Sequence, residues 1–213
     1  DDGDVRTSEL GVAQEFRRTI KGASARLVWR LDAGELTSIS AWRKSVSSED
    51  YSGVGASYTL LASGSQSVTR DEDEITTFSQ ELRYASPKWA HGNVVTGLYF
   101  SDEDGARRLG VRALAARTGA LASATLAEQQ VDSRSAGVFA DGIVHLAPVV
   151  DLTLGARYTR DRKSASLVRS DLLRPASNFS VSALRNTWNE VTPRAVLTWR
   201  PAAGLMTYLS ATR

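Results

Sequence analysis

The chain has 213 residues, of which 42% are hydrophobic and 23% charged, and its formal net charge is +2. It contains no cysteine, which excludes disulfide frameworks, thiolate metal sites and thiol catalysis. The basic excess is small and no run of Lys and Arg carries interleaved aromatic residues, so we expect no nucleic-acid partner. No apolar run approaches the roughly 20 residues of a transmembrane helix, a limit that does not apply to barrels.

The first residues, Asp1-Asp2-Gly3-Asp4, show no signal peptide, so we expect either that one was removed or that the chain is an internal fragment. Residues 1–21 are mixed and polar and are expected to be mainly loop. Alternation of apolar and polar residues then predicts eight strands. They are expected at residues 23–31, 35–44, 74–85, 93–102, 131–146, 150–160, 188–200 and 205–212.

The sixth of these segments shows the pattern most clearly. Its even positions are apolar, from Val150 through Leu152, Leu154 and Ala156 to Tyr158, and its odd positions are polar or glycine. About 9–11 alternating residues is the length that a tilted strand needs to cross a bilayer. We therefore expect the even positions to face lipid and the odd positions, such as Thr153 and Arg157, to face a barrel lumen.

The expected connections alternate in length. Residues 32–34, 86–92, 147–149 and 201–204 are short, whereas 45–73, 103–130 and 163–186 are long, and residues 107–126 are rich enough in Ala, Leu and Arg to predict a short helix. Antiparallel neighbours place successive connections at opposite ends, so the short turns gather at one end, as in outer-membrane barrels. Pro193 cannot donate to a ladder and predicts a local bulge.

Several side chains are candidates for special roles. His91 and His145 lie beside short turns without a spaced set of further ligands, so we expect solvated residues rather than a metal site. The acidic runs Asp71–Glu74 and Asp102–Asp104 lack a calcium-loop spacing and are expected to form a solvated rim, with divalent cations that bridge lipopolysaccharide as a hypothesis. No nucleophile motif occurs, so no catalytic, cofactor or metal residue is expected, and the ligand-binding residues stay unknown.

Charged residues of the strands are expected on the lumen side, where they pair with each other or with a plug. These are Arg26, Arg30, Glu81, Arg83, Asp151 and Arg157. Six aromatic residues lie towards strand ends, as expected of girdles at the membrane interfaces. They are Trp29, Trp42, Tyr84, Phe100, Tyr158 and Trp199.

Five segments resemble TonB-dependent outer-membrane receptors when taken in order. They are Leu36–Arg43, Phe78–Arg83, Thr96–Phe100, Leu152–Thr159 and Tyr208–Arg213. The resemblance, which extends from about residue 20 to the end, implies an all-β, up-and-down antiparallel transmembrane barrel of the bacterial outer membrane. It also implies active uptake of a scarce ligand such as a ferric siderophore, with outer-membrane lipid and the TonB complex as partners and no enzymatic activity.

The family's barrel has 22 strands and an N-terminal plug, and neither the plug, the TonB box nor the terminal aromatic strand matches here. We therefore expect residues 1–213 to be a partial barrel domain of about eight strands, which forms an open curved sheet in isolation. Two alternatives remain open at this point. One is a complete eight-stranded barrel of structural or adhesin type, and the other is a soluble β-sandwich that binds sugar.

Overall fold

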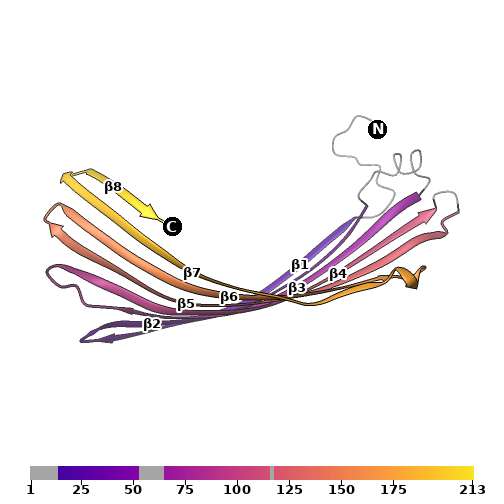
Figure 1. The fold of residues 1–213 in the computed structure, drawn as a ribbon, viewed down its shortest axis with the longest axis horizontal. Helices are drawn as coiled ribbons and strands as arrows, with labels where there is room; N and C mark the ends of the chain where they lie inside the picture. The colour runs from indigo at the N-terminus through magenta and orange to yellow at the C-terminus, as the bar shows by residue number, and fades with distance from the viewer. Residues whose placement is uncertain (1–13, 53–64, 116–117) are drawn as a thin grey trace.

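A computed structural model describes residues 14–52, 65–115 and 118–213. Its eight strands form one antiparallel sheet in the order β1 to β8 (Figure 1). They are β1 Glu15–Leu31, β2 Gly34–Tyr51, β3 Ser65–Ala85, β4 Gly92–Ala115, β5 Leu121–Ala147, β6 Val150–Asp171, β7 Phe179–Ala202 and β8 Leu205–Thr212. A single turn of 3₁₀ helix, η1 Pro175–Ser177, lies between β6 and β7.

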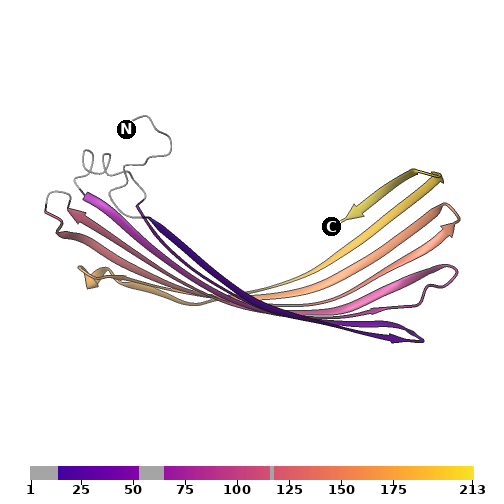
Figure 2. The same cartoon turned by 180° about the vertical axis from the view of Figure 1, so that it is seen from behind.

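The sheet is a single curved layer whose edges, β1 and β8, remain apart (Figures 1 and 2). This confirms the expected all-β antiparallel class and the open curved sheet. Ala124 is the one buried hydrophobic residue of the described part, whereas many large apolar side chains are exposed. No second sheet covers this one among the described residues, which contradicts the sandwich alternative. Within those same ranges, no helix has the length and hydropathy to span a bilayer.

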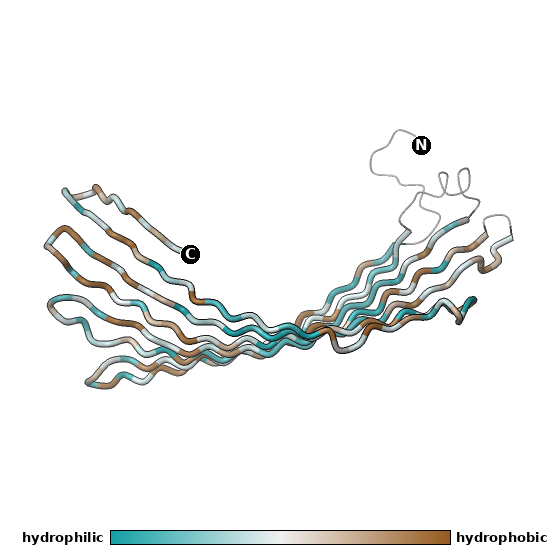
Figure 3. Tube along the Cα trace, viewed as in Figure 1, coloured by the Kyte–Doolittle hydropathy of each residue, from teal (hydrophilic) through white to brown (hydrophobic). Residues whose placement is uncertain are grey.

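Strand register separates the side chains into two faces, because paired residues lie on the same side of a sheet and alternate residues on opposite sides. Leu154 of β6 pairs with Gly142 of β5 and Ala195 of β7, and Leu152 pairs with Val144 and Leu197. We call this side the apolar face and the side of Thr153 and Arg157 the polar face. Hydrophobic residues gather in the half of the sheet that ends in the short turns, here called the proximal half (Figure 3).

All six aromatic residues expected at membrane interfaces lie on the apolar face. Trp29, Tyr84 and Trp199 form a proximal row, and Trp42, Phe100 and Tyr158 form a distal row, to which Phe78 is an addition. Trp42 pairs with Phe78, but Phe78 pairs with Asp102, so Phe100 lies two residues nearer the short turns. A row that slants against the direction of pairing is typical of strands tilted by about 35–45° to a barrel axis.

The strands are much longer than the alternation predicted. The three expected long links, 45–73, 103–130 and 163–186, consist largely of paired strand, and β1 already begins at Glu15. The short helix expected within 107–126 is wrong for the described residues, because 107–115 belong to β4 and 121–126 to β5, while 116–117 lie outside the described residues. Beyond the apolar band neither face of a strand is consistently apolar, so the alternation disappears although the ladder continues. Parts of the expected loops 1–21 and 45–73 lie outside the described residues.

The bulge expected at Pro193 is also wrong. Pro193 pairs with Ala156 without a shift of register, whereas the β6–β7 irregularity lies between Ala165 and Leu167. The carbonyl oxygen of Pro193 accepts a hydrogen bond from the Arg213 backbone N–H at 3.3 Å. The backbone nitrogen of Pro193 therefore faces β8. Its lack of an N–H group removes no hydrogen bond from the β6–β7 ladder.

Candidate functional site

The polar face of the proximal half carries charged side chains at matched positions on neighbouring strands. One cross-strand row runs through Arg83, Gly97, Phe139, Arg157 and Thr192 on strands β3 to β7. The adjacent rows add Glu81 and Tyr99 on the distal side and Asp141 and Arg194 on the proximal side. A shallow depression of about 390 Å³ lies over these residues, which we call the polar wall.

Two glycines leave room for the side chains of Phe139 and Asp141 close to the backbone of the neighbouring strand. A Cβ at Gly97 would stand 2.5 Å from Cζ of Phe139 and 2.7 Å from the Leu82 carbonyl oxygen. A Cβ at Gly155 would stand 2.1 Å from Oδ1 of Asp141. Real Cβ atoms do not approach other atoms this closely, so the phenyl ring and the carboxylate occupy space that only glycine leaves empty. Polar and aromatic groups are thereby fixed against the backbone of the sheet.

Arginine dominates the charge of the polar wall. The Arg157 guanidinium carbon lies 5.3 Å from the centre of the Tyr99 ring, a cation–π geometry, and its Nε donates to Thr159 Oγ1 at 3.0 Å. Arg83 pairs with Glu81, as expected from their shared face. Neither Arg157 nor Arg194 contacts an acidic side chain within the described residues, so the wall offers two cations to an anionic partner.

A second polar group lies at the proximal end of the same face. His145 Nδ1 lies 2.6 Å from Oδ1 of Asp151, and Arg200 pairs with the other oxygen of that carboxylate. His145 is therefore not the free turn residue that we expected, although its side chain is 47% exposed. Arg157 and Asp151 lie on the same face of the sheet, as expected, but they do not form an ion pair with each other. His91 is exposed, and its carbonyl accepts from the His145 backbone N–H at 2.9 Å.

The acidic run Asp71–Glu74 divides between the two faces and is not a rim of free carboxylates. On the polar face, Arg107 Nε donates to Asp71 at 2.9 Å and lies 3.7 Å from Asp73. This hydrogen bond to Asp71 is the main cause that raises the pKa of Arg107. On the apolar face, Glu72 accepts from Arg70 at 2.9 Å and Glu74 pairs with Lys44 at 2.5 Å.

The second acidic run is also divided by alternation. Arg134 Nε lies 3.2 Å from Asp102 Oδ1, and Glu103 accepts from Thr77 Oγ1 at 3.2 Å. Asp104 stands directly opposite Asp132. Throughout the described ranges, no three His, Asp or Glu side chains are grouped so that they could hold a metal ion. Two larger depressions, of about 450 and 530 Å³, lie in the distal half, lined mainly by residues on the side of the apolar face.

Sequence reasoning identified some of the polar wall and missed the rest. Glu81, Arg83 and Arg157 were expected on the lumen side, and they do share the polar face. Tyr99, Phe139, Asp141 and Arg194 were not singled out. Each of these four residues stands directly opposite a glycine of a neighbouring strand, which is Gly137, Gly97 or Gly155, but this match becomes visible only when the register is known.

The chain matches the family model described as "TonB dependent receptor-like, beta-barrel" over residues 2–213. Among solved structures it is similar to the ferric yersiniabactin uptake receptor FyuA from Yersinia pestis (TM-score 0.69, 18% identity), over 91% of this chain and 27% of that one. It is also similar to the siderophore receptor PiuA from Acinetobacter baumannii (TM-score 0.59, 13% identity), over 92% of this chain and 32% of that one.

A third similar structure is the ferric citrate transporter FecA in its unliganded form (TM-score 0.62, 10% identity), over 93% of this chain and 27% of that one. At these identities the likeness shows the fold. The chain spans about a third or less of the length of each of these proteins. No curated protein sequence matches it. Because the family model covers nearly every residue, the chain belongs to the TonB-dependent receptor β-barrel family.

Proposed function

We propose that residues 1–213 form a section of the wall of an outer-membrane receptor that takes up an iron chelate with energy from TonB. One observation carries the proposal. The sheet has no hydrophobic core, and a band of exposed apolar residues between two aromatic rows covers the proximal half of one face. Such a band needs lipid, because water would leave a large apolar area uncovered.

The opposite face suits a water-filled or plugged lumen. The polar wall carries Arg83, Arg157 and Arg194 against Glu81 and Asp141, a net charge of +1 from three cations and two anions. This excess favours an anionic ligand or an acidic surface of a plug. The names of the three similar proteins refer to ferric yersiniabactin, a siderophore and ferric citrate, which supports an iron chelate as the ligand class.

Two unpaired sheet edges support a section of a larger barrel over a complete eight-stranded one. β1 and β8 present backbone N–H and C=O groups that a hydrocarbon environment would leave unsatisfied. In a larger barrel both edges pair with further strands. The role of the section is then to hold the lumen open and to present the polar wall, which is transport and not catalysis.

Uptake of radiolabelled ferric citrate and of a labelled ferric siderophore tests the proposal. The full reading frame that encodes residues 1–213 is expressed in a bacterial strain without its own iron-chelate receptors. We expect uptake of at least one probe, loss of that uptake in a strain without TonB, and recovery of the protein with the outer membrane. Recovery in the cytosol, or uptake that persists without TonB, would contradict the proposal.

A further inference from the structure

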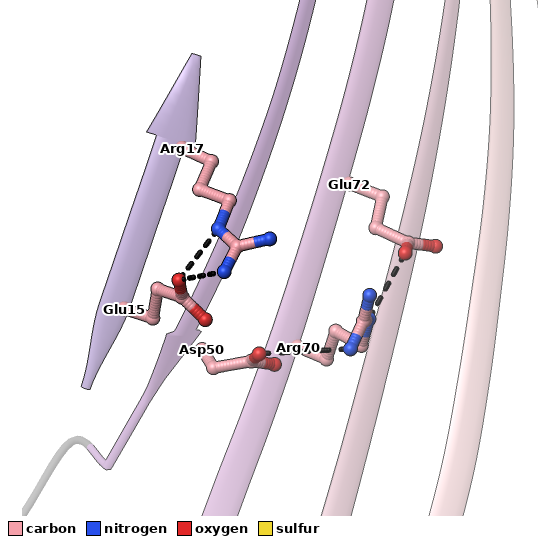
Figure 4. Close-up of polar contacts among 5 residues, drawn as sticks. All are labelled: Glu15, Arg17, Asp50, Arg70 and Glu72. Carbon is pink, nitrogen blue, oxygen red and sulfur yellow. Dashed lines mark hydrogen bonds and ion pairs between the residues drawn. The ribbon is translucent and has the colours of Figure 1, made fainter. Parts of the chain in front are cut away.

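On the apolar face of β1 to β3, arginines are bound to carboxylates. Figure 4 shows Glu15 bound to Arg17 at 2.5 Å, and Arg70 between Asp50 and Glu72 at 3.6 and 2.9 Å. All five residues lie in the distal half of that face, where the opposite charges neutralise one another. Both arginines that these three strands carry on the apolar face therefore have acidic partners.

The polar face of the hairpin of β1 and β2 carries four arginines at equal intervals. Arg18, Arg26 and Arg30 lie on β1, and Arg43 of β2 stands directly opposite Gly22. Arg43 therefore takes the position midway between Arg18 and Arg26, so that an arginine occurs at every fourth residue along the hairpin. At about 3.3 Å per residue, neighbouring members are some 13 Å apart. We call these four residues the arginine column.

The arginine column extends over the full height of the apolar band and beyond it. Arg30 follows Trp29 of the proximal aromatic row, and Arg43 follows Trp42 of the distal row. Arg18 lies farther out, in the distal half of the sheet. All four side chains are exposed on the polar face, so the column is open to the lumen along its whole length.

Most of the charge of the column is not neutralised. Arg30 lies 3.7 Å from Glu35 and is the one member with an acidic partner among the described residues. Arg18 Nε donates to Ser45 Oγ at 3.2 Å, a contact that leaves its charge uncompensated. Glu35 and Glu49 are the acids on the polar face of this hairpin, so four cations and two anions leave a net charge of +2.

The neighbouring strand β3 does not compensate the column, because its acids on the polar face are bound to other arginines. Glu81 lies in the same cross-strand row as Arg26, but it pairs with Arg83. Farther along β3, Arg107 Nε donates to Asp71 at 2.9 Å. The column therefore remains a positive stripe along one side of the lumen.

We propose that the arginine column is a series of binding positions along which an anionic iron chelate passes from the distal end of the lumen to the short turns. The inference rests on the proposed uptake and names the charge of the ligand and its path. An anion midway between two members is about 7 Å from each, within the screening length of about 8 Å at physiological ionic strength. Each arginine therefore attracts the ligand before the preceding one has released it. Passage requires several sites that each bind weakly, and single exposed guanidinium groups meet this condition.

Initial uptake rates of two labelled chelates of opposite charge test the inference. The full protein is expressed as in the uptake assay above. Ferric citrate is the anionic probe, and a ferric hydroxamate with a free ammonium group is the cationic probe. The test variant combines Arg26→Gln with Arg43→Gln. The matched control combines Arg17→Gln with Lys44→Gln, which removes two cations from the other face of the same two strands. Surface binding is measured in parallel on cells without TonB.

We expect the test variant to take up ferric citrate roughly tenfold more slowly than the wild type, at the low end of the range by which a charged cleft raises the local concentration of a counter-ion. Surface binding should change less than the rate, because Arg18 at the distal end is unchanged. Uptake of the cationic probe should not fall, and the control should behave like the wild type. A variant with Arg26→Lys and Arg43→Lys keeps the charges and should retain most of the uptake, which separates lost charge from a damaged fold.

Three results would overturn the inference. They are a wild type that takes up the cationic chelate but not ferric citrate, a test variant with unchanged uptake of ferric citrate, and an equal loss of uptake for both probes. The last result would assign the arginines to contact with an acidic surface of a plug, which affects every ligand alike. Uptake of neither probe by the wild type is a different outcome, because it contradicts the proposed function and the inference falls with it.

Discussion

A charge placed at the middle of the apolar band should destabilise the protein strongly. Leu154 is 50% exposed and lies four residues from Val150, which pairs with Trp199 of the proximal row, and four residues from Tyr158 of the distal row. At about 3.3 Å per residue, Leu154 is some 13 Å along the strand from either row. It therefore lies at the midplane of the band. We expect Leu154→Arg to cost about 2–4 kcal/mol of unfolding free energy.

Two control substitutions separate burial in lipid from other effects of an arginine. Val150→Arg places the same charge at the interface, where the cost should fall to about 0–1 kcal/mol. Thr153→Arg places it on the polar face, next along the chain from Leu154, and should cost little. All three variants are compared by denaturant unfolding of the protein in lipid vesicles. A cost for Thr153→Arg that equals the cost for Leu154→Arg would refute the assignment of the two faces.

Three further predictions concern packing and charge. Gly97→Ala should destabilise the protein by about 1–3 kcal/mol, because the new Cβ meets backbone as well as the Phe139 ring. Gly105→Ala, whose Cβ would stand 3.5 Å from its nearest neighbour, should cost less, and equal thermal midpoints for the two variants would contradict this. Arg107→Ala leaves Asp71 with an 11% exposed side chain and no cation, so proteolysis of the distal strands should accelerate, whereas Arg108→Ala should have little effect. The pKa of Asp104 is raised by its hydrogen bond with Asp132, so this pair stabilises the fold at low pH, and the contribution is lost as pH rises through the folded-state pKa. Asp104→Asn should therefore stabilise the protein at neutral pH and not at acidic pH. An effect of this variant on thermal unfolding that does not change with pH would rule this out.

The proximal half of the fold was predictable from sequence because one of its faces is apolar and the other is polar. Each strand between the aromatic rows must alternate apolar and polar residues, and this pattern is visible without any knowledge of the neighbouring strands. The positions of the short turns, the two faces of β6 and the six interfacial aromatic residues followed from it. The family resemblance depended on these same segments.

The distal half was not predictable in this way. Residues such as Arg107 and Asp71 lie on paired strands beyond the apolar band, where neither face is consistently apolar, so no periodicity marks them as strand. Their order comes from the ladder itself and from cross-strand ion pairs. A composition rich in Ala, Leu and Arg over 107–126 therefore suggested a helix, although tertiary pairing places residues 107–115 in β4 and 121–126 in β5.

The sequence by itself determined which residues form the apolar face, because that choice depends only on alternate positions of a single strand. The tertiary structure decided which residues meet across strands, because register depends on the partner as well as on the strand. Phe139 over Gly97 and Arg157 over Tyr99 both arise from register. The polar wall consists of such contacts, so it does not exist until the strands are paired.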